Sequence, residues 1–466
     1  MKLKKCISAF ITMLIFSLLL NVTGCKGKNE YEYVGGYDEN RTYITASAIS
    51  SVTSERQNLQ TLVKAFEESQ DEIGVRISYI SDYSTGMMNY ITNKNMPDVI
   101  WTAGDLHSPY SSIAKPYFEN LSSWIENDPD VSLDDLQSVS VQSTHCNQKD
   151  TGVWFMPRDI NKVTVIINKD MFAAAGVEVP SADNWNYDTF IDCCVKLRSA
   201  MNGNISPANG IKSSSYPVYT NAGWSVISQT LIKSYGGSLY DTEAVTPTVN
   251  SEENLTAYKK IGTMFYNKYF SPASETANLF STWDAAMAFI VRTDLTSVIS
   301  ANMGNIDFRE NPLAATGAGT TGWAMSSGSS LENKELAWEF LKYTISEEGQ
   351  NVLGATGSCV PVLKSLENSG SWTNYLDSTL NHRAFTSGSE KNFSLNDVYC
   401  FHYSKQAGVK VAAEGIINDV AKAEFWIGTP ISQNVGNLNA WSLSGNWSNI
   451  INSAANYQQK ALSNAG

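Results

Sequence analysis

The strand–helix–strand pattern between residues 42 and 80 constrains the fold of this chain more than any other feature of its sequence. Residues 42–48, Thr-Tyr-Ile-Thr-Ala-Ser-Ala, have the composition of a strand. A helix is predicted next, with Ser54 and Gln57 as its capping box and one apolar face made of Leu59, Leu62, Val63 and Phe66. A second strand follows around residues 75–79. Two strands joined through a helix pair in parallel, so the pattern predicts an α/β fold whose sheet is at least partly parallel.

Further elements continue the same pattern along the chain. Residues 98–101 and 163–167 are predicted to form short buried strands. Near the other end, Asn333 is expected to cap a helix, and Ser346 is expected to begin another that ends around Gly354. The tail over residues 428–466 is expected to be ordered. A chain of 466 residues exceeds the usual size of one domain, so two lobes are expected.

The first 25 residues indicate where the protein works. Three lysines precede an apolar run over residues 7–20, which is too short to span a bilayer as a mature helix. The run leads into Val-Thr-Gly-Cys at residues 22–25, a pattern typical of a lipobox. We therefore predict a lipoprotein signal peptide over residues 1–24, and a lipidated Cys25 that begins a flexible tether over residues 25–40. Lipid would anchor the mature protein at the extracellular face of the cell membrane.

The charge of the chain disfavours two classes of partner. Its formal net charge of -13 becomes -16 once the three lysines of the signal peptide are removed. Nucleic acids and anionic membrane surfaces both bind basic patches. We therefore expect no nucleic-acid partner, and contact with the membrane through the lipid anchor only.

The sequence predicts no cofactor and no metal site. Residues 317–322 match Gly-x-Gly-x-x-Gly, but the residues after them are typical of a strand rather than of the helix that a bound pyrophosphate requires. The histidines and cysteines lack the spacing of metal ligands. Beyond Cys25, the mature chain has an odd set of cysteines with no disulfide framework, although one bridge stays possible: Cys146, Cys193, Cys194, Cys359 and Cys400.

A series of short motifs occurs in a recognisable order. It begins with Met-Pro-Asp-Val-Ile-Trp-Thr-Ala-Gly-Asp at residues 96–105 and Val-Ile-Ile-Asn-Lys-Asp-Met-Phe at residues 165–172. Met-Pro at 156–157 stands between these two motifs. Later members are Tyr-Gly-Gly at 235–237, Ala-Ala-Met at 285–287, Gly-Trp-Ala-Met at 322–325, the run 334–341 and Val-Pro at 360–361. The series resembles the carbohydrate-binding family of extracellular solute-binding proteins of ABC importers, which includes maltose-binding protein. Trp283-Asp284 and Ile167 depart from the family pattern, which usually has glycine and tyrosine there.

The resemblance covers roughly residues 41–365 and implies a two-lobed, periplasmic-binding-protein-like fold with the ligand cleft between the lobes. Three hinge crossings would lie near residues 155–158, 314–319 and 357–361, where Gly317, Gly319 and Gly322 would let the backbone change its φ and ψ. The first lobe would comprise residues 41–156 and 319–356, and the second lobe residues 157–318 and 357–466. The implied function is that of a monomeric receptor, not an enzyme, which captures a carbohydrate, an oligosaccharide, and delivers it to ABC permease subunits.

Eight residues are candidates for ligand contact, because sugar rings stack on aromatic planes and sugar hydroxyls pair with planar polar groups. They are Trp101, Asp105, Arg158, Asn161, Trp224, Trp283, Arg292 and Trp323. For each tryptophan, a role in the core stays an open alternative. Asp98 is expected to be structural, and a core position is expected for Trp154, Trp185 and Trp338.

Two other functions stay open. A surface glycosidase or lyase would need a pair of carboxylates across the cleft, which a single sequence does not exclude. A receptor for a non-sugar solute, such as a peptide or a polyamine, would keep the fold and change the pocket.

Overall fold

The computed structural model describes residues 31–103, 115–145, 152–203, 211–220, 224–238, 248, 250–271, 284–295, 305–394, 426–427 and 442–443. Cys25, Asp105 and Trp283 lie outside these ranges, as does nearly all of the tail over residues 428–466. Within the ranges, no helix combines the length and the apolar composition needed to cross a bilayer.

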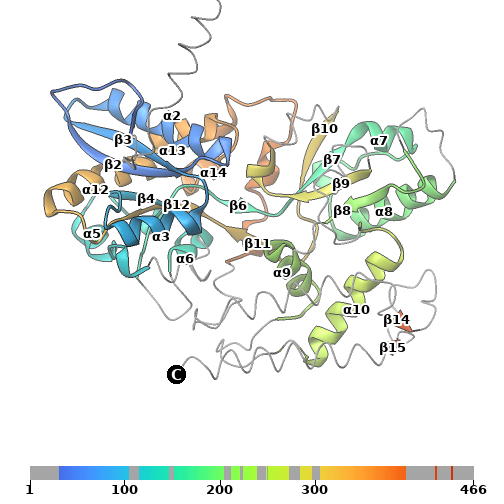
Figure 1. Ribbon diagram of the computed structural model, residues 1–466. Coiled ribbons are helices and arrows are strands. Elements are labelled where there is room, and N and C mark those ends of the chain that lie inside the picture. The colour runs from blue at the N-terminus through green and yellow to red at the C-terminus, as the bar shows by residue number, and fades with distance from the viewer. Residues whose placement is uncertain are drawn as a thin grey trace, which may run out of the picture. The chain divides into compact units, whose positions relative to one another are not determined.

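The first sheet contains the strands that the sequence pattern predicts at the start of the chain (Figure 1). Its central strands follow the order β3-β2-β4-β12-β5, with β2 parallel to β3 and to β4, and β12 antiparallel to its two neighbours. The predicted parallel unit is therefore confirmed. The strands are β2 (Thr42–Ile49), β3 (Ile73–Ile80), β4 (Val99–Ala103), β5 (Met156–Pro157) and β12 (Thr321–Met325).

The second sheet has the order β10-β7-β9-β8, and its two central strands, β7 and β9, are covered on both faces. Alternate residues of β7 and β9 belong to two different hydrophobic clusters, because successive side chains of a strand point to opposite faces. The continuous apolar run of β9 is typical of such a strand. The strands are β7 (Thr164–Asn168), β8 (Tyr216–Tyr219), β9 (Ala285–Ile290) and β10 (Ile306–Glu310).

Three connecting segments run between the two sheets, namely residues 156–163, 315–321 and 356–362. The first two pair with each other through the short strands β6 (Asn161–Lys162) and β11 (Thr316–Gly319), which lie antiparallel. The third lies beside the first, because the amide of Ile160 donates to the carbonyl of Val360 at 2.9 Å. The three predicted hinge crossings of an α/β fold are therefore present.

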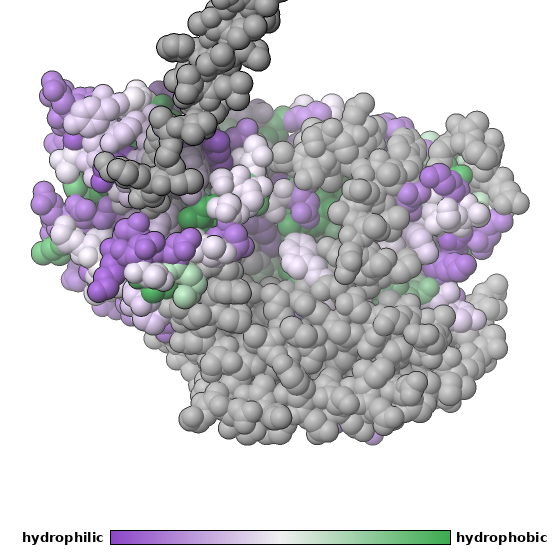
Figure 2. All heavy atoms as spheres, viewed as in Figure 1, coloured by the Kyte–Doolittle hydropathy of each residue, from purple (hydrophilic) through white to green (hydrophobic). Residues whose placement is uncertain are grey.

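Helices cover both sheets, and hydrophilic side chains dominate the visible surface over α3, α5 and α12 (Figure 2). The helices are α2 (Thr53–Ser69), α3 (Tyr83–Asn93), α5 (Ser122–Asn127), α6 (Ser138–Thr144), α7 (Lys169–Ala174), α8 (Tyr187–Asn202), α9 (Ser225–Ser234), α10 (Glu252–Tyr266), α12 (Leu331–Ile345), α13 (Glu347–Ala355) and α14 (Lys364–Ser369). Short strands complete the set: β1 (Glu32–Tyr33), β13 (Asn392–Ser394), β14 (Trp426–Ile427) and β15 (Ser442–Leu443).

Two predicted helix caps are wrong and one is confirmed. Helix α2 begins at Thr53, so Ser54 lies inside it and no side chain caps it. Helix α12 is capped by Ser330, whose hydroxyl accepts from the amide of Asn333, while the Asn333 side chain donates to Asp98. Ser346 caps α13 as predicted, by accepting from the amide of Gly349 at 3.0 Å.

Gly317 of the second connecting segment and Gly322, directly after that segment, serve close packing. A Cβ on Gly322 would collide with the carbonyl oxygen of Met156 in the neighbouring strand β5. A Cβ on Gly317 would come within 2.8 Å of the Thr230 hydroxyl on α9. Neither glycine has a positive φ. The missing side chain at Gly322 lets β12 approach β5, and the missing side chain at Gly317 lets β11 approach α9.

Candidate functional site

The first sheet has a topological switch point, which is where open α/β sheets bind their ligands. From β2 the chain crosses over to β3 on one side of β2, and it then returns to β4 on the other side. The carboxyl ends of β2 and β4, which are neighbouring strands, therefore lie side by side at this switch point. The loop after β2 leads into α2, and Trp101 lies on β4 two residues before that strand ends.

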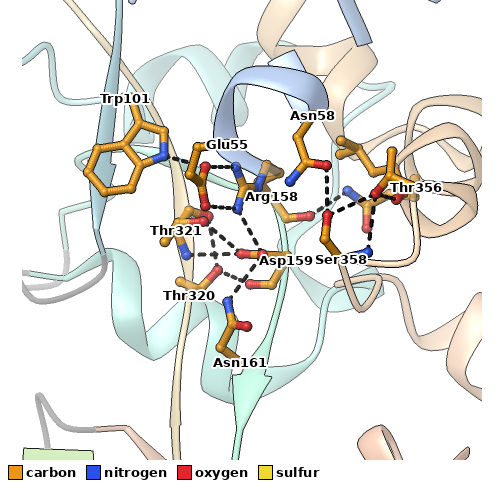
Figure 3. Close-up of polar contacts among 12 residues, drawn as sticks. Glu55, Asn58, Trp101, Arg158, Asp159, Asn161, Thr320, Thr321, Thr356 and Ser358 are labelled. Atoms are coloured by element: carbon orange, nitrogen blue, oxygen red, sulfur yellow. Dashed lines mark hydrogen bonds and ion pairs between the residues drawn. The ribbon is translucent and has the colours of Figure 1, made fainter. Parts of the chain in front are cut away.

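A buried polar junction connects Trp101 on β4 to the first turn of α2 (Figure 3). At its centre the Arg158 guanidinium forms a two-pronged ion pair with Glu55, through Nη1 to Oε2 and through Nη2 to Oε1 at 3.0 Å. Arg158 Nη2 also donates to Asp159 Oδ2 at 2.9 Å. We define the polar junction by its members, which come from α2, β4 and the first two connecting segments: Glu55, Trp101, Arg158, Asp159, Asn161, Thr320 and Thr321.

Hydrogen bonds complete the junction around Asp159. Its Oδ1 accepts from the hydroxyl of Thr321 at 2.8 Å and from the amide of the same residue at 3.2 Å. Its Oδ2 accepts from Asn161 Nδ2 at 3.1 Å, and its carbonyl accepts from the Thr320 hydroxyl. The first two connecting segments are therefore joined through one carboxylate.

The electrostatics of the junction keep Arg158 charged. Burial alone would lower the pKa of this guanidinium, but the carboxylates of Asp159 and Glu55 outweigh it and raise the pKa above its ordinary value. No atom of the Arg158 side chain reaches solvent. A buried ion pair of this kind is satisfied only while all of its partners are in place.

The structure brings four of the eight predicted residues together here. Arg158 and Asn161 are junction members, and Trp101 Nε1 donates to Glu55 Oε2 at 2.9 Å. Trp323 lies opposite Trp101 in the strand pair β4–β12, and its ring is 5.5 Å from Arg158 Cζ.

The four residues differ in their access to solvent. Trp323 has 0% of its surface exposed and Trp101 has 8%, whereas Asn161 is half-buried. Burial of Arg158 and Trp323 favours a scaffold role for both side chains. Their contact with a ligand stays a prediction, as does that of Trp101 and Asn161.

The second sheet presents its own edge to the connecting segments. Strands β8 and β9 are parallel, so their carboxyl ends, followed by Thr220 and Arg292, share one edge, next to the start of β7. Thr220 is buried, and among the described residues its hydroxyl has no hydrogen-bond partner. Trp224 precedes the first turn of α9 with 38% of its surface exposed. Among the predicted tryptophans that the structure describes, Trp224 is the most exposed.

Arg292 lies apart from the polar junction, at the third connecting segment. Its Nε donates to the carbonyl of Gly357 at 2.7 Å, and its Nη1 contacts His382 Nδ1 at 3.0 Å. The rings of Trp372 and Phe385 lie 5.5 Å and 4.7 Å from its Cζ. Because Arg292 is only 1% exposed, its guanidinium holds the backbone of the third segment, and its predicted ligand contact stays a prediction.

The pair of Arg292 and His382 predicts a pH dependence of stability. Burial, and then the Arg292 charge, lower the pKa of His382 from 6.5 to about 4, so the imidazole accepts from Arg292 while it is neutral. The stability from this neutral form is complete above pH 6.5 and is lost as the pH falls towards 4, because the unfolded chain then binds the proton more strongly. We expect a loss of about 2 kcal/mol between pH 7.5 and pH 5 from this group.

Urea unfolding of the wild-type protein and of a His382→Asn variant at both pH values would measure this loss. The free-energy difference between the two proteins is expected to change sign or shrink at pH 5. A difference that is the same at both pH values would contradict the assignment.

Other polar groups have ordinary structural roles. Asp98 accepts from the amide and hydroxyl of Thr45 and from two further side chains, so its predicted structural role is confirmed. Burial raises the pKa of the Cys193 thiol to about 11 and that of Cys359 to about 12. Both are free thiols, and they are poor nucleophiles in this state. In the described ranges, no cluster of three potential metal ligands occurs.

Glu55, Asp159 and His382 are site residues that sequence reasoning missed. Glu55 stands in the first turn of a helix, where an acidic residue is ordinary. Its partner Arg158 follows 103 residues later, so no local pattern links them. Asp159 carried a weak signal, because it stands between the candidates Arg158 and Asn161.

Comparison with known proteins gives a consistent result. Residues 50–351 match the model of the bacterial extracellular solute-binding protein family. No curated protein matches the chain. A solved ABC substrate-binding protein from Listeria monocytogenes, in complex with cycloalternan, is 19% identical, with a TM-score of 0.67 over 91% of this chain and 99% of that one.

Two further solved structures are similar over nearly their whole length. The cyclic alpha-maltosyl-1,6-maltose binding protein from Arthrobacter globiformis is 16% identical, with a TM-score of 0.68 over 91% of this chain and 100% of that one. UgpB from Mycobacterium tuberculosis, in complex with glycerophosphocholine, is 15% identical, with a TM-score of 0.62 over 90% of this chain and 99% of that one. These likenesses confirm the predicted two-lobed fold.

Proposed function

Because the chain belongs to the family of bacterial extracellular solute-binding proteins, we propose that it captures a carbohydrate, an oligosaccharide, and delivers it to the permease subunits of an ABC importer. Two of the similar structures described above are named for binding cycloalternan and a cyclic maltose derivative. We also propose that this receptor is a monomer and that it leaves its ligand chemically unchanged.

One observation carries the proposal. The carboxyl edge of the first sheet, with Trp101, and that of the second sheet, followed by Trp224, are joined by three paired connecting segments. A ligand that contacts both edges stabilises one relative position of the sheets by its differential affinity. For this motion we propose lobes of residues 41–156 with 319–356, and of residues 157–318 with 357–466.

Trp224 is the sharpest test of the ligand contact. Trp224→Ala is expected to weaken oligosaccharide binding by more than about 1 kcal/mol, because an exposed ring that stacks on a sugar is lost. Its effect on unfolding should be small, since the ring is already 38% exposed. Isothermal titration calorimetry, with the melting temperature measured alongside, separates the two effects. Unchanged affinity would remove Trp224 from the site.

A non-sugar solute remains the second candidate. UgpB, which shares the fold, is described in complex with glycerophosphocholine. A thermal-shift screen that contains linear and cyclic oligosaccharides together with glycerophosphocholine distinguishes the two candidates. A ligand at about 100 times its Kd adds about 2.7 kcal/mol to the stability. Stabilisation by an oligosaccharide alone supports the carbohydrate proposal, and stabilisation by glycerophosphocholine alone overturns it.

The location of the protein is tested at Cys25. We propose that lipid on this residue anchors the mature chain at the extracellular face of the membrane, as the lipobox of residues 22–25 suggests. Cys25→Ala is expected to abolish membrane attachment and to leave the melting temperature unchanged. Cell fractionation checks the first effect, and recovery of the mature variant in the membrane fraction would contradict the lipid anchor.

A further inference from the structure

The polar junction joins elements that are distant in the sequence. Glu55 belongs to α2, which starts directly after the loop that follows β2, whereas Trp101 lies on β4, two residues before that strand ends. The carboxyl ends of β2 and β4 border the switch point of the first sheet. The side chains of Trp101 and Arg158 meet at the Glu55 carboxylate, because Glu55 Oε2 accepts from Trp101 Nε1 and from Arg158 Nη1.

All three connecting segments are tied to the same region. The first segment carries Arg158, and the second is held through Asp159. For the third segment, the Ser358 hydroxyl donates to Asn58 Oδ1 on α2 at 2.8 Å. Gln350 Nε2 on α13 donates to the carbonyl of Arg158 at 2.9 Å. The ends of the segments that lie next to the first sheet are therefore fixed by side chains of that sheet and its helices.

Towards the second sheet, the second segment is held by hydrogen bonds of neutral groups on α9, from the Gly317 amide to the Thr230 hydroxyl at 2.8 Å and between Ala315 and Ser234 at 3.0 Å. The first two segments leave the junction as the short strand pair β6–β11, which has two residue pairs in register. Arg292 holds the carbonyl of Gly357, a residue whose φ of 78° is in the left-handed region. No two-pronged ion pair like that of Arg158 and Glu55 holds the segments on this side in the described residues.

We propose that Glu55 and Arg158 are positioning residues of ligand capture, which hold the connecting segments rigidly on the first sheet so that the second sheet moves as one body about β6 and β11. This inference rests on the proposed function, in which closure of the two lobes captures the solute. The two-pronged pairing suits the role, because a guanidinium and a carboxylate in this arrangement fix direction as well as distance. Burial protects the pair from screening by salt.

The chain offers a matched control for the test. Asp128 accepts from Trp338 Nε1 at 2.8 Å and pairs with Lys342 at 3.1 Å. This group has the same composition as Glu55 with Trp101 and Arg158, namely a carboxylate between an indole and a cation. It joins the end of α5 to α12, and in the described residues its ion pair and its indole hydrogen bond reach none of the connecting segments. Glu55→Gln and Asp128→Asn thus each remove one carboxylate charge, the first at a buried site beside the connecting segments and the second at a partly exposed site.

The experiment uses the ligand-free full chain. Spin labels at Lys64 on α2 and Lys196 on α8, both exposed, report the distance distribution between the two sheets by double electron–electron resonance. Hydrogen exchange of the amides of Arg158 and Ile160 reports how often the hydrogen bonds of the first segment to the other two segments open. For Glu55→Gln we expect a broader distance distribution and about tenfold faster exchange at these amides, whereas Asp128→Asn should match the wild type.

Two outcomes overturn the proposal. One is a distance distribution of Glu55→Gln that superimposes on that of the wild type, and the other is equal broadening in Asp128→Asn. If Glu55→Gln does not fold, Arg158→Lys takes its place, because it keeps the charge and loses the two-pronged geometry. Its distribution is then read in the same way. Since no solute is present, failure of every oligosaccharide to bind would bear on the proposed function and not on this result.

Discussion

Replacement of Arg158 by methionine is expected to lower the free energy of unfolding by about 3–5 kcal/mol, which is the cost of breaking a buried ion pair by removing one partner. The variant leaves Glu55 and Asp159 as two buried carboxylates without their cation. The free-energy cost of burying these two charged groups would then no longer be offset by an ion pair with Arg158. Urea unfolding at neutral pH measures the loss.

Lys342→Met is the control for this prediction. Lys342 also pairs with a carboxylate, that of Asp128, but its side chain is 21% exposed and the partner's is 15% exposed. A partly exposed pair of this kind contributes at most about 1 kcal/mol. Equal losses in Arg158→Met and Lys342→Met would show that the polar junction has no special role in stability.

Truncation of Trp323 is the second large effect. Trp323→Ala is expected to cost about 3–5 kcal/mol, because it leaves a cavity in the core of the first sheet, where the indole packs 6.2 Å from the ring of Phe340. Trp323→Phe should cost much less. It fills most of the volume, and it also removes an indole N–H that has no hydrogen-bond partner in the described part of the chain.

Trp224→Ala gives the matched truncation at an exposed site, and its loss of stability should stay below about 1 kcal/mol. Thermal unfolding of Trp323→Ala, Trp323→Phe and Trp224→Ala measures the loss of stability in each variant. If Trp323→Ala unfolds like the wild type but binds sugar more weakly, the ring is a ligand surface and its burial in the core is not the dominant state in solution.

The sequence predicted the strands of this protein well, because the patterns that indicate a strand lie within a few neighbouring residues. Strands β2, β3, β4 and β7 follow from alternating or continuous apolar residues, which are properties of neighbours in the chain. The caps were harder to predict. Asn333 has a good capping side chain, but that side chain donates to Asp98, which is 235 residues away in the sequence. Ser330 therefore caps the helix, and only the folded chain decides between the two residues.

The candidate site was predicted in part. Aromatic and charged residues near the connecting segments were found, because the resemblance to the family located the segments. Whether a tryptophan is exposed depends on which residues of the folded chain pack against it. Trp224 and Trp323 therefore look alike in the sequence, although Trp224 is 38% exposed and Trp323 is 0% exposed. The partner of Arg158 could not be predicted, since Glu55 differs in no local feature from other acidic residues at helix starts.

Small-angle X-ray scattering tests the central claim most directly. The protein is measured alone and with a saturating amount of an oligosaccharide that stabilises it in the thermal-shift screen, and the sugar is recovered for analysis. The account predicts a smaller radius of gyration with ligand and a recovered sugar that is unchanged, because contacts from both sheets hold the closed state. An unchanged radius of gyration together with chemical turnover of the sugar would contradict it in favour of a glycan-active enzyme.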